Sequence, residues 1–238
     1  MVMVKVTSQK ENQQVYVLHT YPFKETSLIV EIFSKEFGRV SLVAKGARRP
    51  KSALRGMLQS FQALEASWSG IGELKTLHGI DWCDQYLPME GNSLICGFYL
   101  NELLLRLLPK EDNYESLFNF YHTTMENLSQ GTNIEVTLRR FELKLLLELG
   151  YEVALKADAN SNEIKADKTY YYEAEQGALE KFRTEKSIKV IGQTLIDMEN
   201  DNFDSATTEL QSKNLMRFLI NYYLGDKPLN SKQLFLNI

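Results

Sequence analysis

The sequence predicts an α+β protein: an N-terminal five-stranded barrel of the OB type, followed by an α-helical domain with a small irregular insert. Three observations lead to this prediction. The first eighty residues hold five short segments with β-strand patterning. The longest connection between these segments comes after the third. Beyond Pro88 the apolar residues recur at helical spacing instead.

The five expected strands cover residues 14–21, 27–34, 39–46, 61–69 and 72–80. The first three are short, rich in β-branched residues and partly alternating, and the fourth alternates its large or apolar residues with polar ones. The tight connection at 36–38 predicts that the second and third strands form a hairpin. An SH3-like barrel has the same number of strands, and strand lengths do not separate the two folds.

The helical part begins with three segments at 94–109, 114–131 and 134–151. Pro109, Gly131 and Gly150 are typical helix stops. A short helix near 192–198 and a longer one at 205–224 follow, and 228–238 has the pattern of a last helical turn. The insert at about 155–186 is polar except for Tyr170–Tyr172, and we expect at most a short hairpin in it. The domain boundaries are therefore 1–82 for the barrel and 83–238 for the helical domain.

Composition indicates an ordinary globular protein. The chain has 238 residues, of which 44% are apolar and 11% aromatic, which argues against disorder. Cys83 and Cys96 have no partner pair, so we expect two buried thiols in a reducing compartment. No signal-peptide pattern opens the chain, and charged residues break its most apolar stretches. The expected location is the cytoplasm.

The charge is unevenly distributed. The whole chain has a formal net charge of −4, yet residues 1–80 carry eleven Lys and Arg against six Asp and Glu. No carboxylate occurs between Glu36 and Glu65. A basic N-terminal part followed by an acidic remainder says more about binding partners than the pI of the whole chain does.

The cations gather in the connection after the third strand. They are Lys45, Arg48, Arg49, Lys51 and Arg55, and Arg39 precedes them in the strand itself. The long loops of an OB barrel hold nucleic acid, where cations neutralise phosphates. The alternative is a solvated loop that only keeps the protein soluble. The missing carboxylates favour a nucleic-acid site.

Aromatic rings are the second requirement of a single-strand site, since bases stack on them. Phe61, Trp68, Tyr21 and Phe23 are the candidates in the barrel. An aromatic residue in a small barrel more often belongs to the core, and the alternation around Trp68 predicts that it is buried. Tyr21 and Phe23 flank Pro22 in an expected loop, where a ring can be exposed.

The sequence resembles a known family, the bacterial recombination mediators called RecO. The similarity runs from 17 to 77, with GRVSLVAKGARRPKS (38–52) as its most recognisable part, and continues in 98–108, 138–151 and 227–235. The resemblance implies an OB domain, a helical domain and DNA repair by recombination. It implies binding of single- and double-stranded DNA and annealing of complementary strands. The implied partners are RecR and the C-terminal tail of single-strand-binding protein, and RecA is loaded indirectly.

The resemblance also assigns residues. The loop cations match the family's DNA-binding surface, and Arg139 aligns with a position that in some members pairs with the carboxylate of the acidic, Phe-ending tail. The alternative for Arg139 is a pair with Glu135 or Glu142 at helical spacing. Many members hold zinc with four cysteines in the insert, but residues 152–186 here contain no Cys and no His. We therefore expect no metal and no other cofactor.

No pattern of catalytic residues stands out. His19, His78 and His122 are isolated, and the AKGARRPKS segment lacks the glycine spacing of a phosphate-binding loop. We expect a non-enzymatic adaptor. The rival is a nuclease or nucleotidyl transferase built on an OB barrel, which would cleave or extend labelled strands with Mg²⁺. A third possibility is an RNA- or ribosome-binding OB protein, which competition between DNA and RNA strands would reveal.

Overall fold

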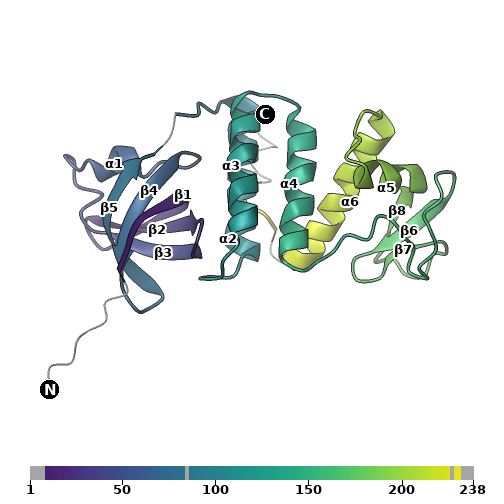
Figure 1. Cartoon of the computed structure of the whole chain (residues 1–238), viewed down its shortest axis with the longest axis horizontal. Coiled ribbons are helices and arrows are strands. Elements are labelled where there is room, and N and C mark those ends of the chain that lie inside the picture. Colours follow the sequence, from purple (N-terminus) through teal and green to yellow (C-terminus); the bar gives the residue numbers. More distant parts are fainter. Residues whose placement is uncertain (1–8, 84–85, 226–227, 232–238) are drawn as a thin grey trace, which may run out of the picture. The chain divides into compact units, whose positions relative to one another are not determined.

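The protein, described here from a computed structural model, divides into two compact units (Figure 1). The division falls between Gln130 and Gly131, so the described residues up to 130 belong to the first unit and the described residues from 131 to 231 belong to the second. The structure describes residues 9–83, 86–225 and 228–231. Most of the last helical turn expected at 228–238 lies outside the described residues.

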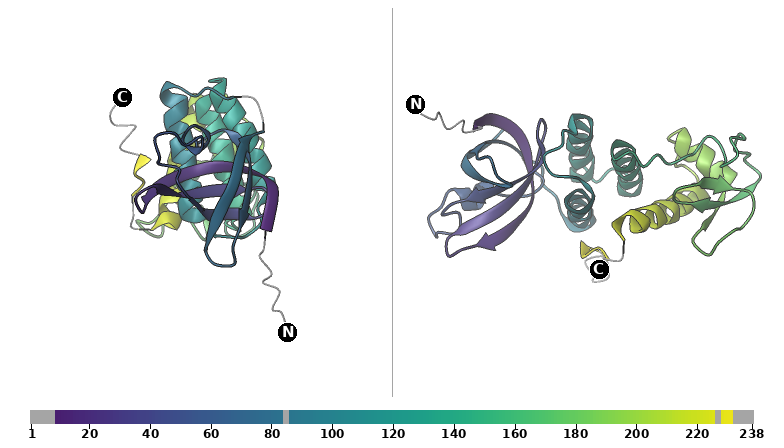
Figure 2. Two further views of the ribbon diagram at one scale, coloured as in Figure 1. Left: turned by 90° about the vertical axis from the view of Figure 1, so that its left-hand side faces the viewer. Right: turned by 90° about the horizontal axis from the view of Figure 1, so that it is seen from below.

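The first unit contains a closed five-stranded barrel in the order β1-β2-β3-β5-β4 (Figure 2). The strands are β1 (Gln9–Phe23), β2 (Ser27–Ser34), β3 (Gly38–Ala44), β4 (Ala63–Ser69) and β5 (Leu74–Trp82). Neighbouring pairs are antiparallel except β3 and β5, which are parallel. This order is that of the OB fold and not of an SH3-like barrel. The predicted fold class and the β2–β3 hairpin are confirmed.

Alternate residues of the strands fill the interior of the barrel. Among them Val17, Ile32, Leu42 and Leu64 have no exposed surface. Trp68 is 1% exposed and belongs to the same cluster, as its alternation predicts.

Two helices, α2 (Gly91–Leu107) and α3 (Glu115–Ser129), pack on the outside of the barrel in the same unit. Tyr16 and Phe33 point outward from β1 and β2, and their rings lie 5.5 and 5.4 Å from that of Phe118. Tyr121 adds a further edge-on contact with Tyr16 at 4.9 Å. Aromatic pairs at such distances add to the free energy gained by burial. The barrel and these helices therefore share one apolar contact layer.

A buried polar contact fixes α2 against β1. The register of β1 with β2 shifts between Val17 and His19, so the ladder is locally interrupted at Leu18. The Leu18 carbonyl instead accepts a 2.9 Å hydrogen bond from the side-chain amide of Asn101. Tyr121 donates its hydroxyl to the other end of the same amide. Burial keeps the pKa of Tyr121 well above its ordinary value, so the hydroxyl remains a donor.

The compact units do not follow the boundary that the sequence predicts after residue 82. The helices α2 and α3 group with the barrel, and the division comes after Gln130. The reason is the contact layer of Tyr16, Phe33, Phe118 and Tyr121. The boundary of the folding domains stays a prediction.

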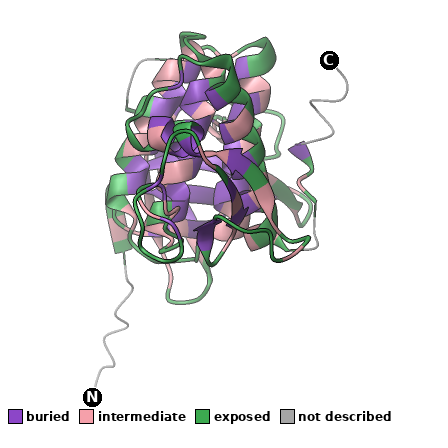
Figure 3. Cartoon of the chain, turned by 90° about the vertical axis from the view of Figure 1, so that its right-hand side faces the viewer, coloured by how far each residue is buried: buried purple, intermediate pink, exposed green. Residues whose placement is uncertain are grey.

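The described part of the second unit consists of three helices and three strands around a separate core. Its elements are α4 (Ile134–Glu148), β6 (Thr169–Glu173), β7 (Gly177–Leu179), β8 (Ile188–Ile191), α5 (Gly192–Glu199) and α6 (Ala206–Leu224). The strands form a sheet in the order β7-β6-β8. Tyr170 and Tyr172 point into the core with Leu146 and Leu215 (buried residues purple in Figure 3).

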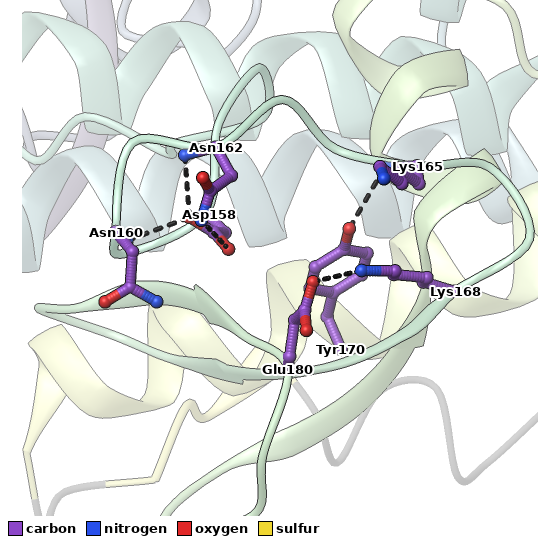
Figure 4. Close-up of polar contacts among 7 residues, drawn as sticks. All are labelled: Asp158, Asn160, Asn162, Lys165, Lys168, Tyr170 and Glu180. Carbon is purple, nitrogen blue, oxygen red and sulfur yellow. Dashed lines mark hydrogen bonds and ion pairs between the residues drawn. The ribbon is translucent and has the colours of Figure 1, made fainter.

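The insert is more regular than its sequence predicts. The short hairpin expected there exists as β6 and β7, and β8 adds a third strand. Asp158 organises the loop before the hairpin, because its carboxylate accepts backbone N–H groups of Asn160 and Asn162 at 2.8 and 2.9 Å (Figure 4). The bond from the Asn162 backbone lowers the pKa of Asp158. Hydrogen bonds and tyrosine packing thus order a segment that has no cysteine.

The expectation that both cysteines are buried is confirmed for only one of them. Cys96 is buried as expected, but the expectation is wrong for Cys83, which is exposed just after the end of β5. No helix among the described residues is long and apolar enough to cross a membrane.

Replacing Asn101 by Leu should destabilise the barrel unit. The change keeps the number of side-chain heavy atoms and the branching at Cγ, but it removes the donor to the Leu18 carbonyl and the acceptor of the Tyr121 hydroxyl. Each buried polar group left unpaired costs about 1–3 kcal/mol. Urea unfolding of the full chain should show this loss. Asn119→Leu, on the exposed side of α3, is the matched control and should stay within about 0.5 kcal/mol of wild type.

Candidate nucleic-acid interface

The candidate site is the connection from β3 to β4, which we call the basic loop (residues 45–58). It contains one helical turn, α1 (Leu54–Met57). All five predicted loop cations are exposed: Lys45, Arg48, Arg49, Lys51 and Arg55. The structure therefore brings them to the surface of one loop, as the sequence predicts.

Apolar side chains anchor the basic loop to the barrel. Ala47 is 1% exposed and belongs to the barrel core, and Leu54, Met57 and Leu58 pack against the same core. These residues are interspersed among the cations along the loop. Burial of the apolar positions turns the intervening charged positions outward.

The turn between β1 and β2 holds the other side of the loop. The Arg48 backbone N–H donates to the Thr26 carbonyl at 2.8 Å, and its guanidinium donates to the Lys24 carbonyl at 3.2 Å. Lys24 is exposed and so adds a sixth cation beside the loop. Sequence reasoning missed Lys24 because it lies far from the loop in the chain, and Glu25 follows it directly.

The loop cations have no acidic partners among the residues that the structure describes. None of the five takes part in an ion pair there, and the only side-chain hydrogen bond is the one from Arg48 to a neutral carbonyl. Elsewhere in the same unit, Lys35 pairs with Glu115 and Lys75 with Glu111. The positive charge of the loop is therefore not neutralised locally.

Arg39 differs from the loop cations. Its guanidinium lies 3.6 Å from the carboxylate of Glu31, and its Nε donates to the Leu108 carbonyl at 3.1 Å. Its side chain is only 17% exposed. Glu31 also accepts a 2.6 Å bond from Ser41. Arg39 thus fixes the end of α2 on β3, and little of its charge faces solvent.

The predicted stacking candidates separate into buried and exposed rings. Phe61 and Trp68 are 4% and 1% exposed and cannot offer a face to a base. Tyr21 is 45% exposed and contacts His19 edge-on at 4.5 Å. Partial burial, with Glu31, raises the pKa of Tyr21, and the hydroxyl stays neutral. Phe23 is half-buried beneath Lys24, whose ammonium lies 5.3 Å from the ring.

Arg139 lies in α4 of the second unit and is paired inside its own helix. Its guanidinium donates to Glu142 at 2.6 Å, one of the two partners that helical spacing allows. Both side chains are buried, with 9% and 1% exposure. Arg139 Nε has no hydrogen-bond partner among the described atoms, and Glu142 competes with any external carboxylate for the guanidinium.

The described residues contain no group of three His, Cys, Asp or Glu side chains positioned to hold a metal ion. Of the two aspartates near the end of β5 that a nuclease could use, Asp81 is exposed and Asp84 lies outside the described residues.

Comparison with known proteins gives a family match along nearly the whole chain. The family model of the Recombination protein O N terminal matches residues 8–86, and that of the Recombination protein O C terminal matches 88–233. The DNA repair protein RecO of Nitrosospira multiformis is 47% identical over 229 residues, covering 95% of each chain. Those of Dechloromonas aromatica and Aromatoleum aromaticum are 44% and 48% identical, and each alignment covers at least 95% of both chains.

Substitution of Arg139 by Ala should cost far more stability than the same change at its neighbour. Arg139→Ala breaks the buried ion pair with Glu142, and breaking such a pair typically costs about 3–5 kcal/mol. Arg140 pairs with Asp201 at 2.7 Å on the surface, so Arg140→Ala should cost at most about 1 kcal/mol. Denaturant unfolding of both variants measures the difference. Equal costs would show that the Arg139–Glu142 pair is not structural.

Proposed function

Because this chain belongs to the Recombination protein O family of DNA repair proteins, we propose that its barrel holds DNA by the phosphates through the basic loop. The supporting observation is the set of five exposed cations that have no acidic partner in the described structure. Lys24 extends the same surface. Cations in this state exchange bound solvent and counterions for phosphates without first breaking internal ion pairs.

Phosphate contacts carry little base information, so binding is largely independent of sequence. The same surface accepts single and double strands, since both present phosphates. Two complementary strands neutralised on it can approach and pair, which is strand annealing. Annealing breaks no covalent bond, and we propose that the protein acts without catalysing a reaction.

In the mediator step, the DNA strand passes from one protein to another. In this proposal the protein, with RecR, loads RecA onto strands coated by single-strand-binding protein. It works in the cytoplasm at nucleoid DNA. The acidic remainder of the chain, with 25 Asp and Glu against 16 Lys and Arg after residue 80, repels DNA and leaves the strand to the barrel.

We place the C-terminal tail of single-strand-binding protein at Arg139. A guanidinium suits the carboxylate of an acidic, Phe-ending peptide. Its Nε donates to none of the described atoms but is buried, so the peptide reaches it only after a local rearrangement. Because Glu142 already holds the guanidinium at 2.6 Å, the tail has to share Arg139 or displace Glu142.

Reversing two charges of the basic loop should abolish most DNA binding. We expect the wild-type affinity for an oligonucleotide to fall about 100-fold between 50 and 200 mM salt, for about five phosphate contacts. Arg48→Glu with Arg49→Glu should weaken binding at low salt and flatten that dependence. Fluorescence anisotropy measures both.

The control for this experiment carries the same charge change in the second unit, at the exposed residues Lys181 and Arg183. Lys181→Glu with Arg183→Glu should bind DNA nearly as wild type does. If the two double variants lose affinity equally, net charge and not the basic loop governs binding.

A peptide titration tests the tail site. Arg139→Lys keeps a cation beside Glu142 but loses the planar fork, so the affinity for an acidic peptide ending in Phe should fall about tenfold. Arg140→Lys on the exposed face of the same helix is the control and should bind the peptide normally. Unchanged affinity in Arg139→Lys and in a folded Arg139→Ala variant rejects the assignment.

A further inference from the structure

An apolar groove follows the basic loop on the barrel unit. We call it the aromatic groove, and its central residues are Gln59, Phe61, Tyr86, Met89 and Phe98. Its volume is about 270 Å³. Pockets for drug-sized molecules span about 300–1,000 Å³, so this groove has room for a single flat ring and not for an extended ligand.

The floor of the groove is built by close packing on a glycine. A Cβ at Gly97 in α2 would come within 2.8 Å of the Phe61 ring and 2.9 Å of the Met89 side chain. The glycine therefore lets both side chains lie directly on the helix. Phe61, with a φ of +70°, meets Phe98 edge-on at 5.0 Å. The Phe61 ring that the sequence offered for stacking is thus the support of the groove.

The rim of the groove is held by a reciprocal pair of hydrogen bonds. The Gln62 side chain donates to the Leu87 carbonyl at 2.9 Å and accepts from the Leu87 N–H at 3.0 Å. These bonds fix the segment that carries Tyr86 next to the start of β4. The groove is therefore a defined feature of the fold, with positioned walls.

The walls expose aromatic surface to solvent. Tyr86 is 59% exposed and Phe98 is 39% exposed. Trp82 is 39% exposed and meets Tyr86 edge-on at 6.4 Å. Rings that are held in place yet exposed are typical of surfaces that stack on a partner.

The groove begins directly after the basic loop in the chain. Gln59 lines the groove and follows Arg55 by four residues, which limits their Cα separation to about 15 Å. No lining residue of the groove is charged. A cationic loop followed by a neutral aromatic groove matches a strand with anionic phosphates and neutral bases.

From this arrangement we propose that the aromatic groove takes an unstacked base of the single strand whose phosphates lie on the basic loop. The proposal rests on the phosphate-binding function above and adds to it a site for bases. Tyr86 and Phe98 supply the stacking faces, and the exposed amide of Gln59 offers both a donor and an acceptor to the base edge. A base within a duplex is stacked and paired, so the groove discriminates in favour of single strands.

Three DNA probes and one small substitution test the proposal on the full chain. The probes are oligo(dT), an abasic strand of the same length and a duplex. Tyr86→Ala should weaken oligo(dT) binding between about 5- and 150-fold, the loss typical of one stacked base. Its affinity for the abasic strand and the duplex should change less than twofold. Tyr86→Phe keeps the ring and should bind oligo(dT) as wild type does.

The control is Phe182→Ala, which removes a ring of similar exposure, 53%, from the second unit and should leave all three affinities unchanged. Wild-type binding of oligo(dT) by Tyr86→Ala would overturn the proposal, and so would an equal loss for all three probes. The proposal would also be overturned if Tyr86→Ala lost affinity for an acidic peptide ending in Phe while it bound oligo(dT) as wild type does. That result would assign the groove to a peptide.

The Arg48→Glu and Arg49→Glu double variant separates this proposal from the proposed function. If it weakens all three probes while Tyr86→Ala weakens none, the phosphate site stands and the base site fails. If the double variant binds all three probes as wild type does, the phosphate function fails and removes the premise of the base site.

Discussion

The separation of the loop cations from carboxylates is the constraint on which the functional account depends. Several cations among the described residues have an internal acidic partner, as Lys75 has Glu111 and Lys168 has Glu180. Arg39 and Arg139 are held by buried glutamates. The basic loop is different because no carboxylate occurs from residue 37 to residue 64, and folding brings none into an ion pair with it among the described residues. Its charge is therefore available to a polyanion.

The fold keeps that loop in place by means other than charge. Ala47, Leu54 and Met57 fasten it to the barrel core, and two hydrogen bonds from Arg48 join it to the β1–β2 turn. Such anchoring lowers the conformational entropy that binding would otherwise cost. The outward aromatic layer of the barrel is covered by α2 and α3 within the same unit. That packing also positions the segment before α2, where Tyr86 meets the groove.

Much of this arrangement follows from local sequence, and the rest depends on contacts between distant residues. The strands, the helices and the exposed loop were predictable because alternation, helical spacing and missing carboxylates are local patterns. The pairing of Arg39 with Glu31 and Leu108 was not, since only closure of the barrel against α2 creates it. Lys24 joins the loop through backbone contacts that no spacing encodes. The aromatic groove depends on Gly97, whose role appears only when Phe61 is packed on it. The third strand of the insert, β8, is four residues long and follows a polar stretch, so its pattern was too short to identify.

The most direct test of the central claim is amide hydrogen exchange of the full chain with and without oligo(dT) at low salt. The account predicts slower exchange at residues 24–26 and 45–58, an effect that disappears when salt is raised. It predicts no change in the β6–β8 sheet. Protection that appears in the second unit while the basic loop exchanges as in the free protein would contradict it.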